Sequence, residues 1–258
     1  MEDLLFSYKT GINKVFGVCV QILNISRSFD KLAFEMELLA KNGIIKATRI
    51  RGNEGKPLIS LAGELSKLPQ QIQPEITELE SKCVLLSRKI ALCSVAARRY
   101  YQYTQSLIRF KATQNRHDQV QSLIQNLHKP TYVKNFISTL SHDEITPIDY
   151  NNFQYLIYKS EDNLKETSAL LFDALDIVSA SLIQIDRIKK IQQTTQYMAI
   201  CISVNAAHLQ SDLQEFNSLI ENIGQVVKNL DNRLLVLQEH VEHGERLLHK
   251  LAHRKSLI

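Results

Sequence analysis

Residues 11–50 read GINKVFGVCVQILNISRSFDKLAFEMELLAKNGIIKATRI, and the spacing of their apolar residues decides the fold. Apolar or small residues recur there at alternating intervals of 3 and 4, which places them on one seam of an α-helix. Together with the residues before it, this stretch predicts a helix roughly 70 Å long. The seam consists of Leu5, Tyr8, Ile12, Val15, Cys19, Ile22, Ser26, Phe29, Ala33, Met36, Ala40, Gly43, Ala47 and Ile50.

Three more stretches, residues 58–93, 164–209 and 216–251, carry the same spacing. Four long helices with coiled-coil seams predict an all-α fold. We expect a long antiparallel coiled-coil four-helix bundle built from two tandem helical hairpins, with a small helical cap inserted at its base. Pro69 occupies a seam position and Pro74 follows it, so we expect a kink in the second helix.

Composition agrees with long helices. The 258 residues include only 8 glycines and 5 prolines and no tryptophan, too few for a turn-rich β fold or a glycine-looped nucleotide enzyme. A hydrophobic content of 44% excludes a disordered chain. The net charge of +4 is too small for nucleic-acid binding to be expected.

Two features of the sequence bear on the cellular compartment of the protein. We find no unbroken run of about 18 apolar residues, and we therefore expect no membrane span. The start, MEDLLFSYKTGINK, carries acidic residues and lacks the apolar core of a signal peptide. Both observations favour the cytoplasm.

Catalytic and metal-binding patterns are lacking. The cysteines, Cys19, Cys83, Cys93 and Cys201, show no CxxC spacing, so we expect no metal or disulfide framework and a reducing compartment. We find no GxSxG, P-loop or HExxH motif, and we predict no enzymatic activity and no cofactor. Late histidines at helical spacing are compatible with metal ligands, but a solvated face is favoured: His240, His243, His249 and His253.

The two halves of the chain share their seam. Met36 corresponds to Thr195 at an offset of 159 residues, which becomes 158 after the turn. This predicts a duplicated hairpin, although any two heptad helices can be slid into register. We expect a first hairpin at 1–100 with its tip near 50–57, a helical and aromatic insertion at 101–159, and a second hairpin at 160–258 with its tip near 210–215. Within the insertion, we expect a helix to about Leu127 and then shorter helices broken at Pro130 and Pro147.

Residues 32–68, LAFEMELLAKNGIIKATRIRGNEGKPLISLAGELSKL, combine the seam with polar residues and a glycine turn in a fixed order. This segment resembles the cytoplasmic signalling tip of bacterial methyl-accepting chemotaxis receptors. In that family, two hairpins from two chains form one four-helix bundle, so the resemblance implies a single-chain pseudo-dimer, with a homodimer as the alternative. The matching positions are Phe34, Leu39, Ala40, Asn42, Ala47, Arg49, Gly55, Ala62 and Glu64.

The resemblance also implies partners. In the family, the residue at the place of Phe34 contacts other receptors, and the arginine at the place of Arg49 lies in the surface for the coupling adaptor and the histidine kinase. This sequence departs from the family at Lys46, where a glutamate is usual, and in a turn that is one residue longer. The tip is therefore basic. The candidate protein-interaction residues are Phe34, Asn42, Lys46, Arg49, Arg51 and Lys56.

These observations predict a non-enzymatic, chemoreceptor-like signalling or scaffold protein. It would present its tip to a chemosensory coupling adaptor, a histidine kinase or chemoreceptors. A structural coiled coil or a membrane-active helical bundle is the alternative. The basic residues around Arg49 also suit a plain helix end, where the dipole favours cations. The run Arg98-Arg99-Tyr100-Tyr101-Gln102-Tyr103 suits either an anionic ligand or aromatic packing of the cap.

Overall fold

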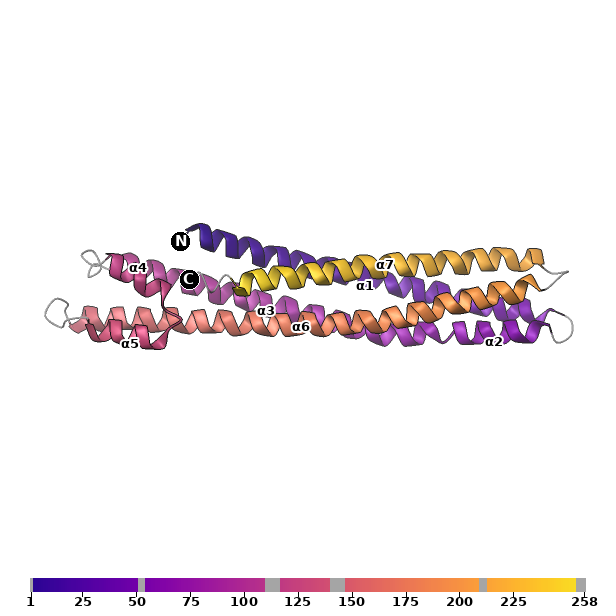
Figure 1. The fold of residues 1–258 in the computed structure, drawn as a ribbon, viewed down its shortest axis with the longest axis horizontal. Coiled ribbons are helices and arrows are strands. Elements are labelled where there is room, and N and C mark those ends of the chain that lie inside the picture. The colour runs from indigo at the N-terminus through magenta and orange to yellow at the C-terminus, as the bar shows by residue number, and fades with distance from the viewer. Residues whose placement is uncertain (1, 51–53, 110–116, 140–146, 209–212, 254–258) are drawn as a thin grey trace. The chain divides into compact units, whose positions relative to one another are not determined.

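A computed structural model describes residues 2–50, 54–109, 117–139, 147–208 and 213–253 of the chain (Figure 1). Every element in these ranges is an α-helix, so the fold is all-α. The elements are α1 (Glu2–Thr48), α2 (Gly55–Leu65), α3 (Leu68–Arg109), α4 (His117–Gln125), α5 (Pro130–Thr139), α6 (Pro147–Ala207) and α7 (Leu213–His253).

The predicted seams are buried along the long helices. On α1, every seam position from Ile12 to Ala47 is buried, and so is every seam position on α2 and α3 from Leu58 to Cys93. On α6, the described seam is buried except at Ala199, which is half-buried. The burial of these apolar stripes is the main free energy that holds helices of this length together.

One position of the α7 seam differs from the prediction. Leu219 is buried, whereas the predicted seam residue Ile220 is half-buried. From Ile223 to Leu251, all predicted seam positions are buried. Leu219 fills this place because its side chain lies beside Gly43 of α1, where the glycine leaves room for it.

Proline divides the predicted second helix into α2 and α3. The Ser66 amide still makes an α-helical bond to the Ala62 carbonyl four residues earlier, at 3.0 Å, but the Lys67 amide donates to the Glu64 carbonyl three residues earlier, also at 3.0 Å. Pro69 explains the break, because it has no N–H for the carbonyl of Leu65 and its ring would clash with that carbonyl. Pro74 lies inside α3 and does not end it.

The predicted continuous helix to about Leu127 is wrong. The helix α3 ends at Arg109, and α4 is a separate element beginning at His117. Leu107 and Leu127 belong to one buried cluster, whereas a straight helix would hold them about 30 Å apart. The prolines after this cluster start helices, as expected: Pro130 is the first residue of α5, and Pro147 is the first residue of α6.

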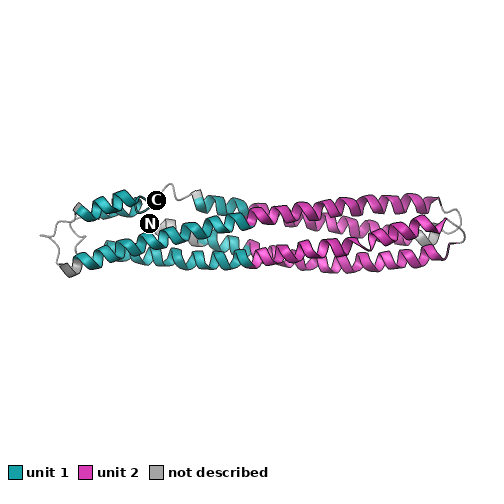
Figure 2. Cartoon of the chain, turned by 90° about the horizontal axis from the view of Figure 1, so that it is seen from below, with its two compact units in different colours: residues 1–17, 85–177, 245–258 teal, residues 18–84, 178–244 magenta. Residues whose placement is uncertain are grey.

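The described helices fall into two compact units (Figure 2). Unit 1 comprises residues 1–17, 85–177 and 245–258, and unit 2 comprises residues 18–84 and 178–244. Each unit thus contains segments from both predicted hairpins. In unit 2, a void of only about 10 Å³ is enclosed by Leu39, Ala40, Gly43, Leu58, Ala62, Leu65, Ile202, Leu219 and Ile223, which come from α1, α2, α6 and α7.

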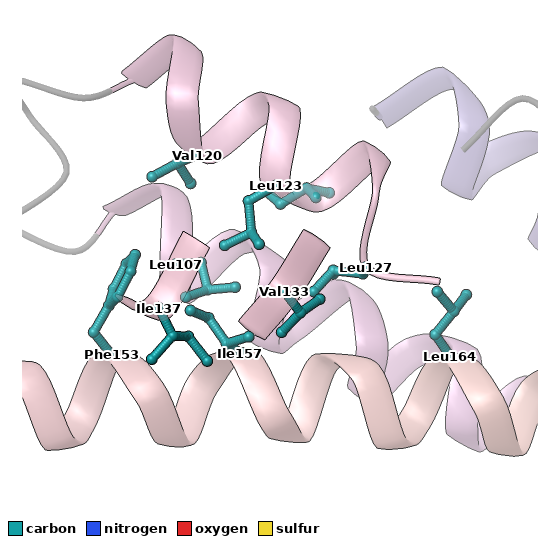
Figure 3. Packing of buried hydrophobic residues seen from close by; sticks show 10 residues of the cluster. Leu107, Val120, Leu123, Leu127, Val133, Ile137, Phe153, Ile157 and Leu164 are labelled. Atoms are coloured by element: carbon teal, nitrogen blue, oxygen red, sulfur yellow. The ribbon is translucent and has the colours of Figure 1, made fainter. Parts of the chain in front are cut away.

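Unit 1 includes residues 101–159, which were predicted to form the cap. Side chains from α3, α4, α5 and α6 point toward one another in Figure 3 and form one buried apolar cluster. The rings of Phe136 and Phe153 pack at 6.4 Å between centroids, and Tyr100 packs against the same cluster. Tyr100 therefore contributes to the packing of this cluster. The members of the cluster are Leu107, Val120, Leu123, Ile124, Leu127, Val133, Ile137, Phe153, Ile157 and Leu164.

One helix of the described chain is apolar enough to cross a membrane. Within Tyr150–Ala207, a window of 18 residues has a mean hydropathy of 1.6, although we had expected no candidate span. The window includes acidic residues, which is why it contains no unbroken apolar run. Because 44% of it is buried inside the protein, and core helices of soluble proteins meet the same criterion, it is weak evidence for a span.

The burial of the cysteines predicts how they react. Cys19, Cys83 and Cys93 are buried, whereas Cys201 is half-buried. Burial, with smaller contributions from Cys19 and Glu80, raises the pKa of Cys83 to about 12. Because the thiolate is the reactive form, we expect an aromatic disulfide reagent to label one thiol per native chain quickly and all four after denaturation. Cys201→Ser should remove the fast phase, and two or more fast thiols would contradict the buried seam.

Candidate protein-interaction surface

The candidate residues lie on unit 2, around the end of α1 and the start of α2. Phe34, Asn42, Arg49 and Lys56 are exposed, and Lys46 is half-buried. Arg51 lies outside the described residues. The structure therefore places five of the six predicted residues on the same two helical segments, and four of these five are open to solvent.

An exposed apolar stripe runs along α1 beside these residues. We call Phe34, Leu38 and Ile45 the tip stripe; their exposed fractions are 67%, 50% and 52%. Spacings of 4 and 7 residues place them on one face of the helix, with Asn42 and Arg49 next to them. Phe34 is thus not an edge-of-core residue, and it is part of a larger apolar surface.

Leu38 and Ile45 were missed by the sequence analysis. Both lie within apolar runs, Leu38-Leu39-Ala40 and Gly43-Ile44-Ile45. In each run one residue belongs to the seam, so the apolar character of the whole run is explained by packing in the core. One signal could have found them. The series Phe34, Leu38, Lys41, Ile45 repeats the 4 and 3 spacing of the seam on a second face of α1.

Cations surround the tip stripe. Lys41 pairs with Glu37 at 2.6 Å, one turn earlier on α1, and both side chains are largely exposed. Lys46 lies in the last turn of α1, where the helix dipole favours a cation. Arg49 follows the helix, and its amide donates to the Lys46 carbonyl at 3.1 Å. These cations stabilise the end of the helix and can also contact a partner, because their side chains reach solvent.

Small residues let the helices approach closely beneath this surface. A Cβ on Gly55, the first residue of α2, would lie 2.3 Å from the Ala47 carbonyl oxygen of α1. A Cβ on Gly43 would lie 3.3 Å from the Ala62 Cβ and 3.4 Å from Leu219 Cδ2. Only glycine fits at Gly55 without a backbone shift. The part of α1 that bears the tip stripe therefore packs closely against α2 and α7; we call this packing the close-packed support.

A similar exposed stripe occurs on α6. Tyr197, Ile200 and Val204 are exposed, and the offset of 159 residues relates Tyr197 to Leu38 and Val204 to Ile45. A hydrogen bond with Cys201 raises the pKa of Tyr197. His208, which corresponds in position to Arg49, is exposed. The likeness between the halves thus extends from the buried seam to the solvent-facing residues.

A surface hollow and the possible metal ligands are the two other candidate sites. An open hollow of about 390 Å³ in unit 1 is lined by residues that include His128, Lys165 and Phe172, but Lys165 is already paired with Glu161 at 2.6 Å. Among the described residues, no group of three His, Cys, Asp or Glu side chains is placed to hold a metal ion. Neither feature combines converging polar groups with an enclosed volume.

No protein-family model matches the chain, and no curated protein matches it. The resemblance to chemoreceptor tips therefore rests on the residues of segment 32–68 that carry it.

A pair of glycine substitutions tests the close-packed support. Gly55→Ala should lower the free energy of unfolding by about 1–3 kcal/mol, because the new methyl group overlaps the Ala47 carbonyl. Gly63→Ala is the matched control in the same helix, since nothing lies within 4 Å of its added Cβ. It should raise the stability by about 0.5–1 kcal/mol through helix propensity. Urea titration measures both; equal effects of the two variants would refute the close approach.

Proposed function

We propose that the protein is a non-enzymatic signalling or scaffold protein of the chemoreceptor type. It presents the tip of its first hairpin to a chemosensory coupling adaptor, a histidine kinase or chemoreceptors in the cytoplasm. The observation that carries this proposal is the tip stripe, which lies on one face of α1 beside Asn42 and Arg49. An exposed apolar stripe rimmed by polar residues is typical of protein-interaction surfaces.

The proposal includes a finer fold, a four-helix bundle of two tandem hairpins with a cap at its base. Gly43 of α1 lies close to Ala62 of α2 and to Leu219 of α7, which supports packing of the first hairpin against the second. In this arrangement, one chain supplies both hairpins that the receptor family takes from two chains. The protein would then be a pseudo-dimer whose two tips differ.

The two tips differ in charge and in their exposed residues. The first carries Phe34, Lys41 and Arg49, whereas the second has Gln193, Ile200 and His208 at the related positions. Charge placed beside an apolar contact sets orientation and partner choice more than affinity. We therefore assign the partner contact to the first tip and expect the partner surface to be acidic.

A membrane-active helical bundle is the second candidate, and the apolar window within Tyr150–Ala207 is the observation in its favour. Insertion would have to expose the buried part of that window, which is 44% of its residues. Release of dye from lipid vesicles by the purified protein would support this candidate. Partner binding with no dye release would favour the tip.

A binding titration tests the tip directly. The full chain is titrated into the coupling adaptor and the histidine kinase of the same cell, and affinity is measured by calorimetry. Phe34→Ser and Arg49→Glu should each weaken binding at least tenfold, since each loses about 1.4 kcal/mol or more at a central contact. Both side chains are exposed, so the fold should not change.

Two matched controls are available in the same unit. Leu235→Ser removes an exposed apolar side chain from α7, and Arg27→Glu reverses an exposed charge on α1 at a distance from the tip stripe. Both should bind as tightly as the unchanged chain. Absence of saturable binding at high micromolar concentration, or an equal loss in the controls, would refute the proposed partner contact.

A further inference from the structure

Unit 1 carries two exposed stripes of opposite charge on neighbouring helices. The basic stripe, on α3, consists of Leu85, Arg88, Leu92, Val95 and Arg99. The acidic stripe, on α6, consists of Asp162, Glu166, Ala169, Asp173 and Asp176. All ten residues are exposed, and both sets follow the alternating 3 and 4 spacing of a coiled-coil seam. These two heptad stripes are not covered by any described helix.

The charges of the stripes are segregated along the sequence. Between residues 81 and 117 there are eight Lys and Arg residues and no Asp or Glu. Within the described part of the chain, Arg88 and Arg99 form no ion pair, and neither do Asp162, Glu166 and Asp176. Asp173 alone is paired, with Lys89 at 2.5 Å. Each stripe therefore has charges that lack a partner of the opposite sign.

Contacts between α3 and α6 fix which stripe residues lie level with one another. Lys89 binds Asp173, and the Cys93 thiol lies 3.8 Å from the Thr167 carbonyl oxygen, so the two helices run antiparallel. Counting one residue forward on α3 for each residue backward on α6 places Arg88 level with Asp173 and Arg99 level with Asp162. Leu92 then lies level with Ala169 at the centre.

We propose that this face binds a second copy of the chain, side by side, about a twofold axis parallel to the helices. Such an axis places the basic stripe of each copy on the acidic stripe of the other, with each residue facing its level counterpart. Arg88 then meets Asp173 of the second copy, and Arg99 meets Asp162. Leu92 packs on Ala169 between these charge pairs. The contact is isologous and closed, since every pair occurs twice.

A second copy fits this face better than a polyanion does. An anionic membrane or a nucleic acid would be attracted by Arg88 and Arg99 but repelled by the acidic stripe one helix away. Packed helices lie about 8–10 Å apart, close to the Debye length of about 8 Å at physiological salt, so at low salt the acidic stripe repels a polyanion that binds the basic one. A partner with the reverse arrangement of charge meets both arginines of the basic stripe, and Asp162 and Asp173 of the acidic stripe, with opposite charges.

The affinity of this contact is expected to be modest. Each stripe extends about 21 Å along its helix, so the face is smaller than the roughly 800 Å² per partner of a standard interface. The three apolar residues on α3, Leu85, Leu92 and Val95, are 42%, 49% and 47% exposed, so part of their burial is already complete. A micromolar dimer that weakens with salt is the expected species.

Charge reversal tests the pairing in the full chain by sedimentation velocity over a range of concentrations. Arg99→Glu places two acidic residues level with one another across the contact, at positions 99 and 162, and Asp162→Arg places two basic residues there. Both variants keep the Lys89–Asp173 pair. Each alone should raise the dissociation constant of the dimer at least tenfold. An equimolar mixture should restore it, because the glutamate at position 99 of one variant then meets the arginine at position 162 of the other, and Asp162 of the first meets Arg99 of the second.

A matched control reverses the same amount of charge elsewhere. Lys189→Glu reverses one exposed cation of α6 in unit 2 and should leave the dimer unchanged. Phe34→Ser should also leave it unchanged, because the tip stripe is not part of this face. Circular dichroism melting checks that every variant folds.

Three results would overturn the proposal. The first is a chain that remains monomeric at high micromolar concentration in low salt. The second is a failure of the mixture to dimerise while each variant is folded. The third is a dimer that Phe34→Ser dissociates and the charge reversals do not, since association would then run through the tip stripe.

Discussion

Burial of one narrow seam on each long helix is the constraint on which the rest of the structure depends. A seam at 3 and 4 spacing uses about two residues in seven. Burial of these residues supplies most of the favourable free energy that holds the helix against its neighbours. Where the seam residues are Ala40, Gly43, Ala47 and Ala62, the helices approach closely and the enclosed void shrinks to about 10 Å³. The remaining positions are then free to serve recognition without weakening the core.

Polar residues at buried positions are accommodated in different ways. Thr167 and Thr195 are buried, and each hydroxyl donates to the carbonyl one turn earlier, on Asn163 and Ile191. This bond removes the cost of burying the hydroxyl without requiring another helix. Ser26 Oγ and Gln184 Oε1 are buried without a hydrogen-bond partner among the described residues. Burial of these two oxygen atoms without a partner lowers the free energy of unfolding of unit 2.

The sequence was sufficient to predict the seams because their period is long and regular. Cys83 and Leu237, for example, are assigned to the core by spacing alone, and both are buried. The prediction from sequence failed where a local interaction overrode the heptad spacing. The end of α2 depends on Pro69, and the exchange of Ile220 for Leu219 depends on the room beside Gly43. The fold-back after Arg109 reflects the cluster around Leu107 and Leu127, which no periodicity within α3 reveals.

The interaction surfaces were less predictable than the core, because an apolar residue beside a seam looks the same in sequence whether a neighbour covers it or not. Burying the rest of a half-exposed side chain such as Leu38 contributes roughly 1 kcal/mol, so the tip stripe alone would not reach the 4.1 kcal/mol of a millimolar complex. Arg49 and Asn42 must add to it, and several tips held together would add more. If the proposed contacts on α1, α3 and α6 form, each is weak and reversible by itself, and assembly of several copies increases the overall affinity.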